Sequence, residues 1–245
     1  RDGIKTGLDA VNLAKFDLIG MDACLMASYE VAQAVNGLTD YLLASEELEP
    51  GHGWDYRSLS AFSAQPSLEP LALGRAIADG FENQAKEYGT ASDITLSLLD
   101  MAHFDEFTDV FREILEDAND EIDQIGAQVR KASTAVPAYG KNPKPELSSH
   151  HFDLGTFVAE WYDWNPGLLA QFEESLGNLV AYKVAGPANQ RSTGLSIYFP
   201  AESSYLDPNY FNLTQQTDVD FTQWSTFLDR YLTAGQQIQV ASYPT

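Results

Sequence analysis

The amino-acid sequence predicts an α/β domain with a mostly parallel sheet, and three observations support this class. Residues 16–21 form a short apolar run of the kind found in buried strands. Residues 25–35 follow with apolar side chains at helical spacing, and Gly37 is placed to end that helix. Residues 41–44 form a second apolar run. This strand–helix–strand order is a βαβ unit, whose two strands are parallel.

Beyond residue 44 the chain alternates between loops, helical patterns and short apolar runs. Pro50, Gly51 and Gly53 mark a loop after the second strand. The longest helical pattern, residues 104–129, spaces most of its apolar side chains by threes and fours and leaves Asp and Glu on the other face. The other expected elements, in chain order, are a helix over residues 68–81, a strand at 94–99, a turn-rich break at 137–145, helices at 154–161 and 168–179, a strand at 194–200 and a last helix at 221–231.

These patterns divide the 245 residues into three parts. Residues 1–100 carry the βαβ unit and the third strand. Residues 101–192 are expected to form a helical subdomain. Residues 193–245 supply a late strand and a closing helix that pack back on the sheet. The length suits one large domain with additions.

The composition is acidic and globular. Asp and Glu number 36 against 14 Lys and Arg, which gives a net charge of -22, and 44% of the residues are hydrophobic. Such a surface repels phosphate backbones, so we expect no nucleic-acid partner. No apolar run reaches the roughly 18 residues of a membrane span, so we expect no membrane insertion. The first residue is Arg1 and no signal peptide is visible, which favours a chain that begins part-way through a longer product.

Cys24 is the only cysteine, so no internal disulfide can form. A lone thiol is more often an inert core residue than a nucleophile, and only its neighbours can argue for catalysis. Cys24 comes just after the strand at residues 16–21, and the loop that begins at Ser45 follows the next strand. Ligand sites of open α/β sheets lie at the carboxyl ends of the strands. The sequence therefore places Cys24 and this loop at one candidate site.

Three segments resemble the clostripain family of cysteine peptidases. They are GMDACLM at residues 20–26, SEELEPGHGWDY at residues 45–56 and GLSIYFP at residues 194–200, and their order and spacing agree over roughly residues 15–231. The resemblance implies a caspase-like fold whose first strands are absent from this chain. It also implies a thiol protease with a Cys/His dyad that cleaves peptides or proteins after Arg or Lys, and autoprocessing into two chains.

The resemblance assigns roles to residues at the candidate site. Cys24 would be the nucleophile that forms an acyl-enzyme, aided by a helix start and an imidazolium. Asp22 would line the specificity pocket, where it could pair with a substrate Arg or Lys; the alternative is a helix cap. Ser45, Glu47 and Glu49 are candidates for the opposite pocket wall, or are solvated loop residues. The aromatic residues of the same loop are candidates for the cleft or for the core, namely Trp54 and Tyr56.

The catalytic histidine is the missing part of this assignment. The family's histidine precedes the nucleophile, at the end of the preceding strand, and is usually followed by Gly. All four histidines of this chain come after Cys24, namely His52, His103, His150 and His151. The pair His52–Gly53 mimics the family's dipeptide, but it lies in the later loop. We therefore expect the histidine to come from an upstream light chain or N-terminal segment of the same gene product.

Two further expectations concern the class of function and the surroundings. The alternative to an enzyme is a peptidase-like binding module that has lost its histidine. A Cys/His dyad requires no cofactor. The family's founding member responds to calcium, however, and the acidic loops of this chain would supply oxygen ligands for that ion. No Asp-x-Asp-x-Asp-Gly loop is present. The acidity and the resemblance favour a secreted or cell-envelope location.

Overall fold

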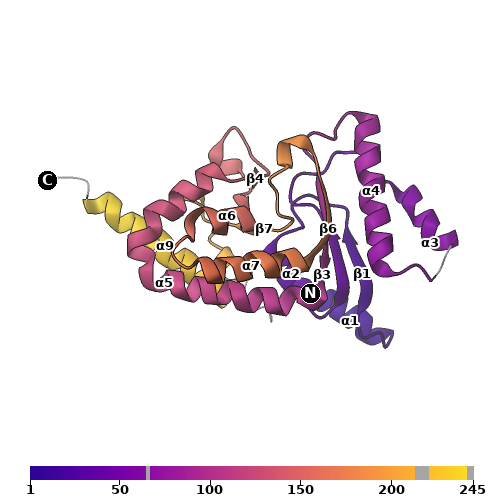
Figure 1. Cartoon of the computed structure of the whole chain (residues 1–245), viewed down its shortest axis with the longest axis horizontal. Coiled ribbons are helices and arrows are strands. Elements are labelled where there is room, and N and C mark those ends of the chain that lie inside the picture. Colours follow the sequence, from indigo (N-terminus) through magenta and orange to yellow (C-terminus); the bar gives the residue numbers. More distant parts are fainter. Residues whose placement is uncertain (65–66, 213–220, 242–245) are drawn as a thin grey trace.

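The computed structural model describes residues 1–64, 67–212 and 221–241, and Figure 1 shows how their elements are arranged. A four-stranded sheet in the order β1-β2-β3-β6 forms the central layer. Its strands are β1 Phe16–Met21, β2 Thr39–Ala44, β3 Thr95–Asp100 and β6 Val180–Ala185. Helices pack on both faces of this sheet, which agrees with the predicted α/β class.

The sheet is mixed rather than mostly parallel. β1 and β2 are parallel and joined by α2 (Tyr29–Val35), as the βαβ unit predicts. β3 runs antiparallel to β2, and β6 runs antiparallel to β3. α4 (Pro70–Tyr88) leads the chain back to the end of the sheet where β2 stops. The contact between Thr90, just past α4, and His52, in the loop after β2, shows this. β3 must therefore run back, which corrects the expectation from the sequence.

Side chains that alternate along the strands bury both faces of the sheet. Leu43 and Leu98 join a smaller apolar cluster under α4. Leu42 and Leu99 join the larger cluster on the opposite face. In Figure 1, α4 and α3 (Ser60–Ala64) lie on one side of the sheet, and α2, α5 and α7 lie on the other.

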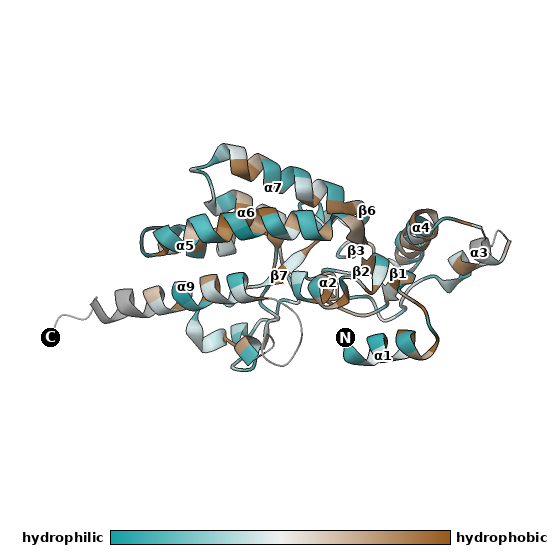
Figure 2. Ribbon diagram, turned by 90° about the horizontal axis from the view of Figure 1, so that it is seen from below, coloured by the Kyte–Doolittle hydropathy of each residue, from teal (hydrophilic) through white to brown (hydrophobic). Residues whose placement is uncertain are grey.

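The larger cluster is built around the long helix α5. Its apolar stripe faces the core and its acidic residues face solvent, so its ribbon changes between brown and teal in Figure 2. Three aromatic rings of this stripe, Phe104, Phe107 and Phe111, pack against one another and around Tyr29 of α2. Besides α2, four described helices belong to this layer: α5 Phe104–Ala135, α6 Leu154–Trp161, α7 Pro166–Leu179 and α9 Thr222–Ala241. At the start of the chain lies α1 Asp2–Ala10.

A small antiparallel sheet in the order β4-β5-β7 lies beside the main one. Its strands are β4 Ala138–Tyr139, β5 His151–Asp153 and β7 Ser196–Tyr198. The strand expected at residues 194–200 is β7. β6 was expected to be part of a helical subdomain, but it joins the main sheet beside β3. β6 follows α7 directly, without a loop. Its short apolar pattern therefore could not be told apart from the helical pattern of α7 in the sequence.

The helix after Cys24 begins later than expected. α2 starts at Tyr29, and the hydroxyl of Ser28 caps it by accepting a hydrogen bond from Val31 N. Leu25 has a φ of 62°, a left-handed conformation that no residue of a right-handed helix adopts. Residues 22–28 therefore form a loop, and Cys24 is separated from the first turn of α2.

Candidate active site

The loop that carries Cys24 is held against the loop that follows β2. Leu25 N donates to Glu47 O at 3.3 Å, and Ala27 N donates to Ser45 O at 2.8 Å. These bonds join the two loops just beyond the carboxyl ends of the parallel strands β1 and β2. The two predicted parts of the site therefore meet at one edge of the sheet, with Cys24 exposed to solvent.

Glu49 contacts Cys24 directly through its backbone. Its N–H donates to Sγ of Cys24 at 3.2 Å. The contact orients the thiol relative to the loop of residues 45–56, which carries the other candidate residues.

Asp22 is surrounded by the same loop. Its Oδ2 accepts hydrogen bonds from Tyr56 Oη at 2.8 Å and from Trp54 N at 3.3 Å. Gly53 lets the loop pass this close, because it has a φ of 63° and a Cβ there would lie 3.0 Å from Oδ2 of Asp22. Asp22 is not a helix cap, since Ser28 caps α2.

The side chain of Glu49 reaches Asp22. The two carboxyl groups interact, and Trp54 holds both: Oε1 of Glu49 accepts from Trp54 Nε1 at 3.0 Å, and Asp22 accepts from Trp54 N. Burial, followed by the contact with Asp22, raises the pKa of Glu49 to about 8. Burial alone would raise the pKa of Asp22, but hydrogen bonds to Glu49, Tyr56 and Trp54 outweigh it and hold that pKa below its ordinary value.

Ser45 and Glu47 point elsewhere. The hydroxyl of Ser45 is buried and bonds Thr95 Oγ1 and Glu47 O, each at 3.0 Å. Oε1 of Glu47 accepts from Gly140 N and from Leu48 N, both at 2.8 Å. Of the three residues predicted for the opposite wall, Glu49 lies beside Asp22, while Ser45 and Glu47 join the loop to its neighbours.

The sequence left open whether the two aromatic residues of the loop belong to the core or to the cleft. Trp54 is buried in the smaller apolar cluster, yet its two N–H groups reach Glu49 and Asp22. Tyr56 is 62% exposed and directs its hydroxyl at Asp22.

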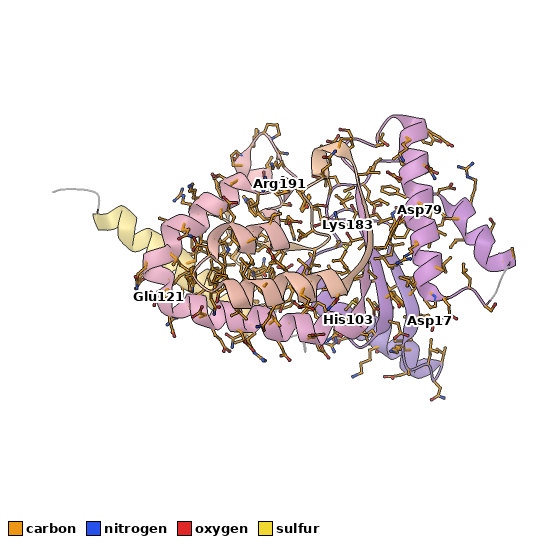
Figure 3. The ribbon with its side chains drawn as sticks, in the orientation of Figure 1. Asp17, Asp79, His103, Glu121, Lys183 and Arg191 are labelled. Atoms are coloured by element: carbon orange, nitrogen blue, oxygen red, sulfur yellow. The ribbon has the colours of Figure 1, made fainter. Side chains whose placement is uncertain are left out.

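No hydrogen bond or ion pair joins any of the four histidines to Cys24 in the part of the chain that the structure describes. The ring of His52 bonds Gly53 O and Thr90 Oγ1, at 2.7 and 2.8 Å, and stacks on Tyr88. His103 follows β3, so it lies at the opposite edge of the sheet, at the start of α5 (Figure 3).

The other two histidines belong to the small sheet. His150 stacks on Tyr205, and burial, with His151 as neighbour, lowers the pKa of His150. Nδ1 of His151 lies 3.1 Å from Ser149 O. Neither contact involves the loop that holds Cys24.

A buried acid beneath the site was not singled out by the sequence. Glu46 is fully buried and meets Tyr139 Oη at 3.2 Å, which in turn lies 3.2 Å from Asp153. Burial, followed by the charge of Asp153, raises the pKa of Glu46 well above its ordinary value. The positive charge of Lys183 on β6, labelled in Figure 3, opposes that rise. No local signal in the sequence singles it out, because Glu46 lies in the loop after β2 beside two other acids, Glu47 and Glu49.

Among the described residues no group of three or more His, Cys, Asp and Glu side chains is placed to hold a metal ion. Calcium binding therefore stays a prediction. No described helix combines the length and apolar character needed to cross a membrane.

A family model and several solved structures are similar to this chain. The model of the Clostripain family matches residues 3–231. A clostripain from Bacteroides thetaiotaomicron, in complex with the peptide inhibitor BTN-VLTK-AOMK, superposes with a TM-score of 0.62 at 19% identity, over 91% of each chain. A secreted C11 cysteine protease from the same species has a TM-score of 0.64 at 20% identity, over 90% of this chain and 58% of that one.

A third similar structure is an inactive zymogen C11 protease from Parabacteroides distasonis, with a TM-score of 0.60 at 20% identity. This chain covers 62% of that protein's length. At these identities the likeness establishes the caspase-like fold. No curated protein sequence matches this chain.

Proposed function

The chain belongs to the clostripain family of cysteine peptidases, and from this premise we propose that it is an endopeptidase that cleaves after Arg or Lys. The observation that carries the proposal is the pair of carboxyl groups, Asp22 and Glu49, beside the thiol of Cys24. A guanidinium or ammonium group bound by this pair would bring the next peptide bond of the substrate to Cys24.

Two further observations support a basic residue before the cleaved bond. Asp22 is held by neutral donors, Tyr56 and Trp54, which leaves its negative charge for a ligand. One structural relative is in complex with an inhibitor whose peptide part, VLTK, ends in lysine.

The reaction would pass through a thioester on Cys24. Sγ attacks the carbonyl carbon of the bond after the Arg or Lys, and a histidine takes the thiol proton and returns it to the leaving amine. Water then hydrolyses the thioester and releases the carboxylic acid.

The histidine, in this proposal, comes from a segment that pairs with β1. β1 is an edge strand of the described sheet, and Phe16 on it is 39% exposed. An open edge presents unpaired N–H and C=O groups that a further strand can bond. A strand added there would end at the same sheet edge as β1 if it ran parallel, close to Cys24. The zymogen among the structural relatives supports the idea that such a segment is separated by proteolytic processing.

A peptide panel tests the proposed activity. The complete protein should cleave peptides with Arg or Lys before the scissile bond at least about a hundredfold faster than matched peptides with Glu or Leu. A peptidyl ketone with a terminal Arg or Lys should label Cys24, which peptide mapping locates without ambiguity because the chain has a single cysteine. The Cys24→Ala variant should neither cleave nor be labelled.

Cleavage that survives Cys24→Ala would contradict the mechanism. Faster cleavage after acidic or apolar residues would contradict the specificity. Tight binding of basic peptides without any cleavage, in the complete protein, would favour the binding module instead.

We also propose a secreted location. The support is the acidic composition, with a net charge of -22, and the similarity of the fold to that of a secreted C11 cysteine protease. Fractionation of producing cells into medium, envelope and cytosol, followed by immunoblotting, is the measurement. Retention of the protein in the cytosol would contradict it.

A further inference from the structure

The two carboxyl groups of the pocket lie close together in a partly buried site. Asp22 and Glu49 are both held by N–H groups of Trp54 and interact with each other, and two neighbouring carboxyl groups out of water cannot both ionise without a large cost. The pocket without substrate therefore holds one proton between two acids.

The remaining contacts decide which acid holds that proton. Oδ2 of Asp22 accepts from Tyr56 Oη and Trp54 N, which stabilises an ionised carboxylate. Glu49 accepts from Trp54 Nε1 through Oε1 only, while its Oε2 is buried and accepts no hydrogen bond. A buried, ionised oxygen without a donor is costly, and protonation removes the charge and with it most of that cost. The proton thus lies on Glu49.

The surroundings of the pair contain few other titratable groups. Tyr56 from the same loop touches Asp22, and His52 acts on Asp22 electrostatically. Cys24, from the loop after β1, meets Glu49 only through the backbone N–H.

We propose that Glu49 is a proton-exchanging specificity residue, which is neutral in the empty pocket and loses its proton to solvent when the cationic side chain of a substrate enters. The inference rests on the proposed specificity for Arg or Lys. Substrate binding then forms an ion pair with both carboxylates and releases one proton. Proton release is expected at neutral pH, because the pKa of Glu49 is about 8 in the empty pocket.

Proton release has two measurable consequences. As the pH rises toward the pKa of Glu49, binding of a basic peptide should tighten by up to about tenfold per pH unit. Above that pKa, the affinity should become independent of pH. Because the N–H of Glu49 also bonds Sγ of Cys24, the same residue connects occupancy of the pocket with the position of the thiol.

Calorimetry on the complete protein tests the proposal. The Cys24→Ala variant is titrated at pH 7 with a peptide ending in Arg, in two buffers of different ionisation enthalpy, and the difference in heat gives the number of protons released. We expect close to one proton per peptide. With Glu49→Gln added, we expect no release, because the amide is neutral and has no proton to lose.

A matched control is Glu87→Gln, which neutralises an exposed acid on α4 and should leave the release unchanged. A second measurement, the affinity of the Cys24→Ala protein between pH 6 and pH 9, needs no change at Glu49. Binding without proton release, or with the same affinity over that range, overturns the inference and leaves the specificity intact. If the Arg peptide does not bind at all, both the inference and the proposed specificity fail.

Discussion

Asp22 is the residue that, in the proposed pocket, we expect to bind the basic side chain of a substrate. It sits two residues before Cys24 and carries the ionised charge of the pair, held by Tyr56 and Trp54. Glu49, by contrast, supplies a buried and neutral acid. Two carboxyl groups thus play different parts because their surroundings differ.

We predict that Asp22→Asn weakens cleavage after Arg without silencing the thiol. The amide oxygen can still accept from Tyr56, but a charge-assisted bond to the substrate is lost, at a cost of about 1.5–3 kcal/mol. This corresponds to a fall in kcat/KM of roughly one to two powers of ten. The rate of alkylation of Cys24 by iodoacetamide should hardly change. Unaltered kcat/KM for Arg peptides would show that Asp22 does not contact the substrate.

At the scale of elements, the loop after β2 is held from below by a buried polar network. Glu46 lies between the two residues whose carbonyls bind the Cys24 loop, and it meets Tyr139 of β4. The network therefore joins the small sheet to the active-site edge of the main sheet.

We predict that Glu46 makes the protein less stable as pH rises. Its pKa in the folded state lies well above the ordinary value of 4.5, so above that pH the folded state keeps a proton that the unfolded chain loses. The free energy of unfolding then falls with rising pH, by up to about 1.4 kcal/mol per pH unit, until the folded pKa is passed. Glu46→Gln removes this loss, since Gln stays neutral.

Urea unfolding at several pH values between about 5 and 7 measures the effect. The stability of Glu46→Gln relative to the parent protein should increase with pH, whereas that of the surface variant Glu87→Gln should show no such trend. A constant difference between Glu46→Gln and the parent would mean that Glu46 is ionised in the folded state.

The junction of β6 with β3 depends on a single glycine. Gly186 N donates to Ile94 O at 2.8 Å, and a Cβ on Gly186 would lie 2.2 Å from Ala91 O. Gly186→Ala should therefore lower the free energy of unfolding by about 3 kcal/mol, because a backbone group must move. Gly177→Ala, on α7, is the control: its Cβ meets nothing within 4 Å, and the variant should be stabilised by up to about 1 kcal/mol. Equal unfolding midpoints for the two variants would contradict the packing described for β6.

At the scale of the whole molecule, β1 is the edge strand of the described sheet that leads to the Cys24 loop. β1 pairs with β2 on one side, and Phe16 and its neighbours are exposed on the other. The opposite edge strand, β6, is packed by α4 and α7.

We predict that residues 1–245 expressed alone differ from the same chain produced with the upstream segment that we propose to supply the histidine. The chain alone should associate or precipitate, since an open apolar edge promotes pairing between copies, and should have little activity on Arg peptides. The co-produced form should be soluble and active, with the upstream segment bound. Light scattering and peptide cleavage are the measurements. A soluble, monomeric and fully active chain 1–245 would mean that one of its own histidines is catalytic, with His52 as the first candidate.

Much of the molecule was predictable because its signals are local. The strand at residues 16–21 and the helix at residues 154–161 agree with β1 and α6, since an apolar run and a helical period need no distant partner to be recognised. The adjacency of Cys24 and the loop from Ser45 was predictable as well, because the parallel pairing of a βαβ unit determines it.

The sequence by itself determined the α/β class, the order of most elements, the thiol and the family. The tertiary structure alone decided the direction of β3, the place of β6 and the late start of α2. It also decided which acid of the loop faces Asp22: Glu49 does, while Ser45 and Glu47 turn to Thr95 and Gly140. The physical reason is range: a period or a cap is written within a few residues, whereas strand direction and the sharing of a proton depend on groups that only folding brings together.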